Sequence, residues 1–389
     1  MVLELSKKYQ PYMVELRRHL HMHPELSLQE FETSKLVQRE LEKLGIPFEV
    51  IPGSTSVMAT IQGGKPGKTI ALRADMDALP IQELGEPPYK SQVEGSMHAC
   101  GHDGHTAALL GAAHILMDLR EEIAGTVKLF FESGEEFGGT VQIADKEGYL
   151  EGIDHCFGIH IWADIPVGRI SCAPGARMAG TDLFTLKITG KGAHASTPNQ
   201  GIDAIVAASS IVMNLQTIVS RELFPQDVGL VTIGKLTAGQ RFNAIADEAI
   251  LEGNLRYFDP ALSDQYPVMI NRIAENTAAA FRAKSEMIHH LKGTPAVINT
   301  EENTAFGQKV VAELFGEDCF YDMPPLMAGE DFAIFMEKVG GLFVFVGGGF
   351  RDKESAPHHN GHFDIDEDSL RISAALHAQY AIQYLASHT

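Results

Sequence analysis

The sequence predicts an α/β protein that carries a smaller, inserted α+β module. Its 389 residues exceed what one hydrophobic core usually holds, so two domains are expected. Short β-branched runs alternate with helical patterns through the first part of the chain, and the pattern changes near residue 181. Hydrophobic residues make up 44% and charged residues 21%, a balance typical of folded globular proteins that excludes a disordered chain.

The first 44 residues predict two helices with a break at His23 and Pro24, because proline disfavours helical geometry in the residue before it. Gly45 and Pro47 end the second helix. Strand patterns follow at 57–61, 69–73 and 126–131, with a helix pattern at 106–119. This alternation predicts a sheet covered by helices on both faces, with the loops at its strand ends available for chemistry.

The stretch from 181 to 293 predicts a self-contained module. An alternating strand is followed by Gly190 and Gly192, then by a helix, two paired strands, a second helix and a last strand. The expected elements are strands at 183–188, 228–233 and 248–257 and helices at 203–220 and 264–284. This order is the ferredoxin-like pattern of two-layer folds. The remainder, residues 1–180 and 294–389, is expected to form one discontinuous domain.

The charge balance excludes a nucleic-acid partner. Asp and Glu outnumber Lys and Arg by 51 to 31, and a chain with a net charge of −20 and no basic stripe repels a phosphate backbone. The N-terminus lacks the apolar core of a signal peptide, and no apolar run approaches the length of a membrane span. The four scattered cysteines favour reduced thiols over a disulfide framework, so we expect a cytoplasmic protein without a membrane partner.

Histidines gather in two short segments. In the first, Cys100 and His102 stand at alternate positions before a helical pattern, where both can point to one side of an extended backbone. Thiolate and imidazole together suit a divalent metal such as Zn²⁺ or Mn²⁺. A polar helix start capped by Asp103 is the alternative. In the second segment, His358, His359 and His362 follow the strand expected at 342–346, and a solvated polar turn explains them equally well.

Other strand ends carry further candidate ligands. Glu135 and Glu136 follow one strand, Asp75 and Asp77 follow another, and His160 lies in the apolar run 156–162. Surface acid pairs are common, and a histidine in an apolar run is more often a core residue than a ligand. Ligands of open α/β sheets bind at the carboxyl ends of strands. The presence of candidate residues at several strand ends therefore favours a single shared site.

Taken together, these segments resemble the amidohydrolase branch of the di-metal aminoacylase and carboxypeptidase superfamily. That branch contains hippurate hydrolase, plant auxin-conjugate hydrolases and bacterial N-acyl-amino-acid amidohydrolases. The resemblance runs almost end to end, and its motifs occur in the family's order. They are Arg17-Arg18-His19, His23-Pro24-Glu25, residues 73–80, residues 100–105, Glu135-Glu136, His160, Gly192-Ala193-His194, Asn243, Gly329-Glu330-Asp331-Phe332 and residues 359–363.

The resemblance implies a di-metal centre in the larger domain. It implies two divalent ions per subunit, Mn²⁺ or Zn²⁺, held by Cys100, His102, Glu136, His160 and His359. Cys100 takes the bridging position between the two ions. Glu135, beside the glycines Gly138 and Gly139, takes the place of the general base. Asp75 is interpreted as a partner that orients His102. Gly361 stands where the family's His-x-Pro-x-Phe pattern has proline. The choice of His359 as the ligand, in place of His358 or His362, is therefore the least secure of the five assignments.

The resemblance also implies that the inserted module is a lid and dimerisation domain. His194 is expected to stabilise the oxyanion and, as in related enzymes, to reach the active site of the other subunit of a dimer. Asn243, Arg256 and Gly329 take substrate-binding positions, although an ordinary strand salt bridge explains Arg256 equally well. A homodimer or homotetramer is therefore expected.

The implied activity is metal-dependent cleavage of the amide bond in small N-acyl-L-amino acids, which releases the free amino acid and a carboxylic acid. One alternative is a di-metal dipeptidase or carboxypeptidase of the same superfamily, against which Cys100 in the bridging position argues. Another is a non-catalytic binding protein that keeps the fold. The presence of Glu135 and of every candidate ligand argues against that alternative.

Overall fold

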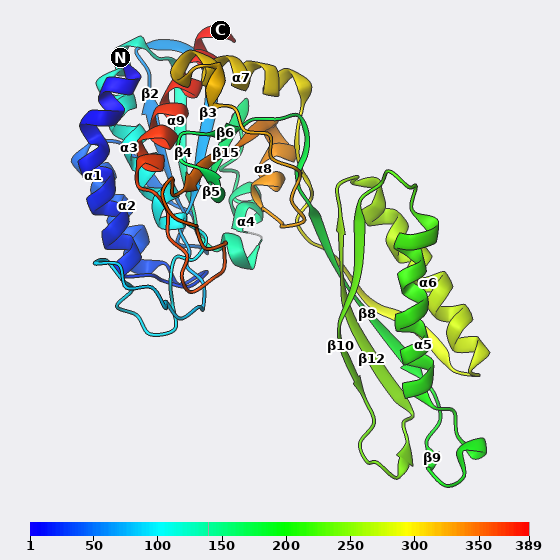
Figure 1. Ribbon diagram of the computed structural model, residues 1–389. Helices are drawn as coiled ribbons and strands as arrows, with labels where there is room; N and C mark the ends of the chain where they lie inside the picture. The colour runs from blue at the N-terminus through cyan, green and yellow to red at the C-terminus, as the bar shows by residue number, and fades with distance from the viewer. Residues whose placement is uncertain (139, 389) are drawn as a thin grey trace. The chain divides into compact units, whose positions relative to one another are not determined.

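The computed structural model describes residues 1–138 and 140–388, and it divides into two compact units (Figure 1). Unit 1 contains Met1–Arg177, Ile298–Pro324 and Asp331–Thr389, and unit 2 contains Met178–Val297 and Pro325–Glu330. The segment 325–330, which the sequence places in the larger domain, groups with unit 2. There the Ala179 N–H donates to the Ala328 carbonyl and Met178 forms a β-bridge with Leu326.

Unit 1 is built on a seven-stranded mixed sheet of order β1-β2-β4-β3-β5-β15-β6. Its central strands β4, β3, β5 and β15 run parallel, whereas β1, β2 and β6 join antiparallel at the edges. The strands are β1 (Phe48–Val50), β2 (Val57–Gln62), β3 (Lys65–Asp75), β4 (Ala124–Glu132), β5 (His155–Pro166), β6 (Ile170–Ser171) and β15 (Gly341–Gly349). The predicted α/β class with a mixed sheet is confirmed.

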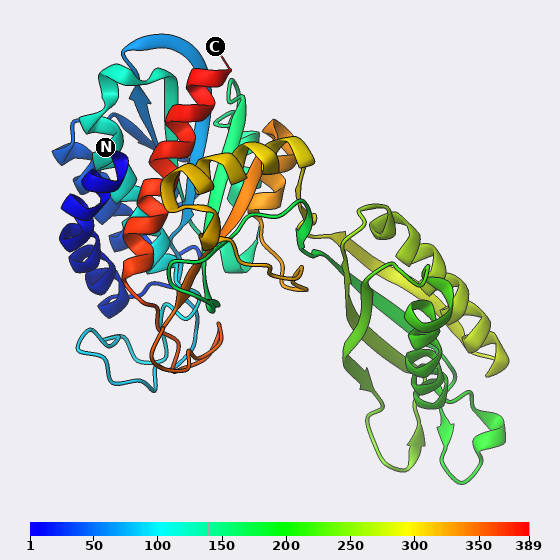
Figure 2. The ribbon, with the colours of Figure 1, turned by 45° about the horizontal axis from the view of Figure 1, so that its top comes forward.

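Helices cover this sheet, and α1, α3 and α9 lie side by side on one face of it (Figures 1 and 2). The helices of unit 1 are α1 (Val2–Met22), α2 (Phe31–Lys43), α3 (His102–Asp118), α4 (Thr140–Lys146), α7 (Glu301–Phe315), α8 (Phe332–Val339) and α9 (Asp368–Ser387). Single turns of 3-10 helix occur at η1 (Arg120–Glu122), η2 (Glu135–Phe137) and η5 (Glu317–Cys319). The predicted break at His23 and Pro24 is confirmed, since α1 ends at Met22.

The start of α3 differs from the prediction. The sequence predicts a helix from residue 106 preceded by an extended loop, but α3 begins at His102, directly after Gly101. Gly101 adopts a left-handed conformation with φ of 92°, which a residue with a side chain rarely tolerates. This sharp turn, and not an extended backbone, brings Cys100 and His102 to the same side.

Unit 2 has an antiparallel sheet of order β10-β12-β8-β13, with both long helices, α5 and α6, on one face (Figure 1). Its main elements are β8 (Gly180–Thr189), α5 (Ala204–Thr217), η4 (Ile218–Glu222), β10 (Gly229–Ala238), β12 (Glu248–Tyr257), α6 (Ala261–Ala280) and β13 (Lys284–Lys292). Their succession along the chain is the ferredoxin-like order. A short ribbon pairs β9 (Ala193–His194) with β11 (Ala244–Ile245) beside the 3-10 turn η3 (Pro198–Gln200), and β7 (Gly175–Met178) pairs with β14 (Val297–Asn299) where the chain passes between the units.

One stretch of unit 2, Ala204–Glu222, is long and apolar enough to cross a membrane by length and composition, which the sequence prediction did not anticipate. A core helix of a globular unit meets the same two criteria. Its residues Ala207, Ile211 and Leu215 are fully buried in the apolar core of unit 2. Asp203 caps its N-terminus by accepting hydrogen bonds from two backbone N–H groups.

Candidate metal centre

Predicted site residues of unit 1 lie on neighbouring strands or in the segments that follow them. Asp75 ends β3, Glu136 follows β4 in the turn η2, and His160 lies within β5. His359 lies in the loop after β15, and its N–H donates to the Ala99 carbonyl beside Cys100. Because parallel strands end at the same edge of a sheet, residues separated by more than 200 positions meet there.

The structure brings all five predicted ligands together. Cys100 Sγ lies 3.5 Å from His160 Nε2, and His359 Nε2 lies 3.0 Å from Glu136 Oε1. Among the groups of potential ligand atoms within 4.8 Å of one another, three contain at least two predicted ligands: Cys100 with His160 and His358, Cys100 with Glu136 and His359, and His102 with Glu135 and Glu136. Cys100 belongs to two of these groups, so its sulfur lies where it can be shared by two ions.

Hydrogen bonds fix which ring nitrogen of each histidine carries its proton. His102 Nδ1 donates to Asp77 Oδ1 at 3.1 Å, and His160 Nδ1 donates to the Ile161 carbonyl at 2.9 Å. A neutral imidazole that donates from Nδ1 carries its lone pair on Nε2. His102 Nε2 is buried and makes no hydrogen bond within the described part of the chain. A buried lone pair of this kind fits a metal ligand, and the proton arrangement is the usual one for ligating histidines.

The charges of the cluster also fit a divalent cation. Burial raises the pKa of the Cys100 thiol, and the neighbouring His102 lowers it only in part. Hydrogen bonds with Cys100 and Glu136 raise the pKa of His359 to about 10, so positive charge is favoured beside the sulfur and the carboxylate. Bound cations stabilise a thiolate and a carboxylate in the same way, and their binding displaces protons from such ligands. The residues present therefore fit a metal centre.

Asp77 contacts the predicted ligand His102 more directly than the predicted partner Asp75 does. Its Oδ1 accepts from His102 Nδ1, whereas Asp75 Oδ2 lies 3.7 Å from His102 Nε2. Asp77 also accepts hydrogen bonds from the backbone N–H groups of Glu135 and Glu136, at 3.2 and 3.1 Å, and from Ser27. Burial raises the pKa of Asp77, but hydrogen bonds from His102 and Ser27 lower it more. The ionised carboxylate of Asp77 thus positions both the imidazole of His102 and the turn that carries Glu135 and Glu136.

Asp75 instead joins His105 to a buried arginine. His105 Nδ1 donates to Asp75 Oδ1 at 2.6 Å, and Arg73 donates to Asp75 Oδ2 at 2.7 Å. Arg73 also pairs with Glu132 at 2.7 Å and with Asp331 at 3.0 Å, and all four side chains are almost completely buried. Burial raises the pKa of Asp75, but the charges of His102, His105 and Arg73 hold it well below its ordinary value. This network ties the ends of β3 and β4 to the start of α8.

Glu135 lies on a sharp turn beside the predicted ligands His102 and Glu136. Gly134, with φ of 70°, starts the turn, and a Cβ there would come within 2.7 Å of a Leu28 methyl carbon. The Glu135 carboxylate lies within 4.8 Å of the ligand atoms of His102 and Glu136 and accepts from the Asp331 N–H at 3.4 Å. Gly138 closes the turn at φ of 77°, and Gly139 lies outside the described residues.

The predicted site residues of unit 2 lie at two different ends of that unit. His194 pairs with Ala244 between β9 and β11, and the Ala195 N–H donates to the Asn243 carbonyl at 3.1 Å, so His194 and Asn243 are neighbours. Both side chains are exposed. Arg256 lies near the far end of β12, which has 10 residues and therefore spans roughly 30 Å. The first pair is thus separated from Arg256 by almost the length of the strand.

Arg256 has the environment of an anion-binding group. Its Nη1 atom and the Thr181 hydroxyl are buried and make no hydrogen bond within the described part of the chain. A Cβ on Gly329 would lie 3.3 Å from Arg256 Nη1 and 3.4 Å from the Thr181 oxygen, so a side chain there would crowd both groups. Burial lowers the pKa of Arg256, as expected for a guanidinium without a counter-ion. A strand salt bridge for Arg256 is not among the ion pairs of the described residues.

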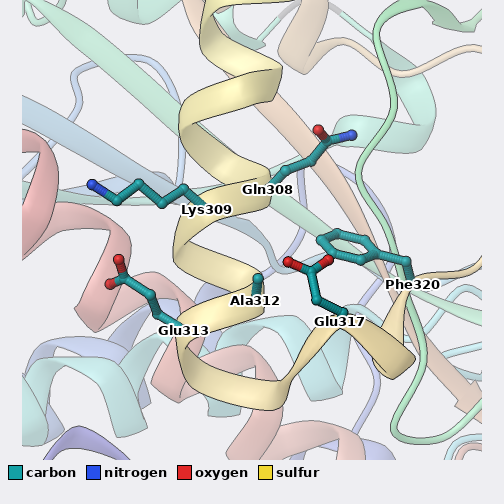
Figure 3. Close-up of a pocket in the computed structure, with 6 residues that line it drawn as sticks. All are labelled: Gln308, Lys309, Ala312, Glu313, Glu317 and Phe320. Carbon is teal, nitrogen blue, oxygen red and sulfur yellow. The ribbon is translucent and has the colours of Figure 1, made fainter.

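A hollow on the surface of unit 1 is separate from this chemistry. It is lined by Gln308, Lys309, Ala312, Glu313, Glu317 and Phe320 from α7 and η5 (Figure 3). In Figure 3, Lys309 and Glu313 lie on one side of the helix, whereas Gln308, Glu317 and Phe320 lie on the other. The side chains do not converge on one point, and none of the metal-ligating candidates lines it.

The chain is similar to known proteins over almost its whole length. The model of peptidase family M20/M25/M40 matches residues 71–383. An IAA-amino acid hydrolase of Arabidopsis thaliana (ILR1-like 2) is 40% identical over 389 residues, covering 99% of this chain and 88% of the relative. N-acetyl-L-cysteine deacetylase of Bacillus subtilis is 40% identical over 358 residues, covering 92% of this chain and 84% of the relative.

Two further similarities bear on substrate and metal. Thermostable carboxypeptidase 2 of Saccharolobus solfataricus is 35% identical over 382 residues, covering 97% of this chain and 96% of the relative. The crystal structure of the Bacillus subtilis YXEP protein, described as a dinuclear metal-binding peptidase from the M20 family, superposes with a TM-score of 0.86. It is 35% identical and covers 98% of this chain and 99% of that one.

Proposed function

Because the chain belongs to peptidase family M20/M25/M40, we propose that it is a metal-dependent hydrolase of the amide bond in N-acyl-L-amino acids. The observation that carries this proposal is the convergence of five potential ligands beside Glu135. Two divalent ions, Mn²⁺ or Zn²⁺, would be held by Cys100, His102, Glu136, His160 and His359. When bound, such ions polarise a substrate carbonyl and make water a stronger nucleophile at neutral pH.

Glu135 is proposed as the general base. Its neighbour Glu136 faces the ligand group with Cys100 and His359, and the turn leaves the Glu135 carboxylate beside His102. In this position it would take the proton of the attacking water and later pass it to the leaving amine. The backbone N–H groups of Glu135 and Glu136 both donate to Asp77, which would keep the two carboxylates in these different positions.

His194 is proposed to donate a hydrogen bond to the oxyanion. His194 Nδ1 lies 3.1 Å from the Ser196 nitrogen and 2.7 Å from the Ser196 hydroxyl oxygen, and with Nδ1 as the acceptor of both groups the ring proton is on Nε2. A neutral donor aimed at developing negative charge typically contributes on the order of 10²-fold or more in rate. Asn243, its neighbour, would contact the same end of the substrate.

Arg256 is proposed to bind the carboxylate of the amino-acid product, with Gly329 leaving space for it. The unpartnered Nη1 atom and Thr181 hydroxyl support this role. Since His194 and Arg256 lie at opposite ends of unit 2, one copy of the unit does not present both to one substrate. This separation supports a homodimer in which His194 serves the metal centre of the partner subunit, with unit 2 as the lid and dimerisation domain. A homotetramer of such dimers is compatible with the same arrangement.

A carboxypeptidase is the second candidate, supported by the similarity to thermostable carboxypeptidase 2. Both activities cleave an amide whose nitrogen belongs to a free amino acid, so both need a cation for the carboxylate. They differ in the acyl side, which is a small acid in one case and a peptide in the other. We also propose a cytoplasmic location, because all four cysteines are buried and unpaired.

An activity screen separates these candidates. The protein is stripped of metal, reloaded with Zn²⁺, Mn²⁺, Co²⁺ or Ni²⁺, and assayed on N-acetyl-methionine, hippurate and an N-blocked dipeptide. Release of free amino acid from the first two, with little from the dipeptide, is the expected result. Faster release from the dipeptide would establish the carboxypeptidase, and inactivity with every metal would contradict both.

A further inference from the structure

We propose that His358 is a positioning residue whose Nδ1–H donates a hydrogen bond to the Cys100 sulfur, and that it is not a metal ligand although it lies among them. The inference rests on the proposed metal centre and deepens it. His358 Nδ1 lies 3.8 Å from Cys100 Sγ and forms a potential ligand group with Cys100 and His160. Distance alone therefore allows either role, and the position of the ring proton decides between them.

The other nitrogen of His358 is already used as an acceptor. The backbone N–H of Ala163 donates to His358 Nε2 at 3.0 Å, so the lone pair is on Nε2 and the proton is on Nδ1. A protonated nitrogen has no lone pair for a metal ion. His102 and His160 show the opposite arrangement, with Nδ1 hydrogen-bonded to an oxygen and Nε2 directed to the ligand cluster, where His160 Nε2 lies 3.5 Å from Cys100 Sγ.

The sheet explains why His358 accepts this hydrogen bond. Strand β3 pairs with β5 only as far as Arg73 opposite Gly158, so the β5 edge beyond that point has no backbone partner from β3. Two alternate N–H groups of this segment, from Ile161 and Ala163, donate to imidazoles instead: Ile161 to His105 Nε2 at 2.8 Å and Ala163 to His358 Nε2. Because buried backbone donors must be paired, both rings are fixed as acceptors at Nε2.

Aromatic packing leaves the His358 ring little freedom to turn. Trp162, the only tryptophan of the chain, stacks on it with ring centres 4.1 Å apart at an interplanar angle of 27°. Phe363 packs against it at 4.8 Å. If the ring flipped while packed between Trp162 and Phe363, it would lose the hydrogen bond from the Ala163 N–H.

The neighbouring His359 has the properties of a ligand instead. Its side chain is 51% exposed, and its Nε2 faces Glu136 Oε1 at 3.0 Å. Its backbone adopts φ of 59°, an uncommon conformation for a residue other than glycine. The two adjacent histidines thus have different roles. His359 faces the proposed metal position, and His358 donates a hydrogen bond to the Cys100 sulfur. Hydrogen bonds to a ligating sulfur tune its donor strength.

Nitrogen NMR of the histidine-labelled wild-type protein, with and without ¹¹³Cd²⁺, tests this directly. We expect His358 to keep its Nδ1 proton in both states, whereas His102 and His160 show cadmium coupling at Nε2. Cadmium coupling at His358 would overturn the inference. Failure of the protein to bind any cadmium would contradict the proposed function itself, so the two failures are distinguishable.

His358→Leu provides a second test with Co²⁺ as the probe. Two ions should still bind, with affinity lower by about tenfold, and the sulfur-to-cobalt charge-transfer band should move to lower energy because the thiolate loses a donor. His362→Ala, which changes an exposed histidine of the same loop, is the matched control and should leave the band unchanged. Loss of one of the two ions in His358→Leu, or an unchanged band, would contradict the role of His358. If that variant does not fold, the NMR measurement on the wild type decides alone.

Discussion

The candidate site residues of unit 1 and unit 2 differ in how completely their own unit holds them. In unit 1, Asp75 and Asp77 are buried and hydrogen-bonded, and each fixes a histidine ring. In unit 2, His194 and Asn243 are exposed, and Arg256 Nη1 is unpartnered among the described residues. The proposed metal centre is thus held by groups of unit 1 alone, whereas the groups of unit 2 that we propose to bind substrate are exposed or lack a hydrogen-bond partner within the described residues.

The largest expected effect belongs to the proposed base. Glu135→Gln should lower kcat by at least about 10³-fold, because an amide cannot accept the proton of water. Both metal ions should remain, since Glu136 and the other ligands are unchanged. Rate measurements and metal analysis on the same preparation check both statements. Glu147→Gln, at an exposed position of unit 1, is the control, and near wild-type turnover of Glu135→Gln would remove this residue from the mechanism.

Subunit mixing tests whether His194 of unit 2 serves the metal centre of the partner subunit. His194→Ala should lower kcat on the order of 10²-fold, the loss expected for one oxyanion donor. If His194 acts in the partner's site, mixing this variant with Glu135→Gln should restore about a quarter of the sites, because half of the random dimers are mixed and each has one intact site. Activity is measured after subunit exchange has been verified. A mixture that stays inactive would place His194 in its own subunit or outside the mechanism.

Cys100→Ser tests the shared sulfur of unit 1. A hydroxyl is not deprotonated beside a cation as readily as a thiol, so metal affinity should fall by about 10- to 100-fold. Equilibrium dialysis of this variant with Zn²⁺ or Mn²⁺ gives the affinity. Cys319→Ser, at a cysteine far along the chain in η5, is the matched control. Unchanged affinity in Cys100→Ser would contradict a bridging thiolate.

The same contrast explains how far the sequence alone could lead. Strand and helix periodicity predicts both layers of unit 2 and the central strands of unit 1, because these follow from local alternation of apolar residues. Residue types in loops and at strand ends indicate a site, and the resemblance to the amidohydrolase branch selects the five residues that cluster in the structure. The choice between Asp75 and Asp77 as the partner of His102 depends on side-chain geometry that no spacing expresses. The start of α3 depends on the left-handed turn at Gly101, and the proton position on His358 depends on where β3 stops pairing with β5.

Arg256→Lys is expected to give the smallest effect, and it addresses unit 2 alone. Lysine keeps the positive charge but loses the planar fork that binds a carboxylate through two hydrogen bonds, so KM should rise by about tenfold while kcat changes little. Metal content should not change, because no predicted ligand comes from unit 2. Arg221→Lys, at an exposed position of η4, is the matched control. A substrate whose amino-acid carboxylate is replaced by an amide should lose the difference between wild type and Arg256→Lys. If the difference persists with that substrate, Arg256 acts through the structure of unit 2, and the carboxylate is bound elsewhere.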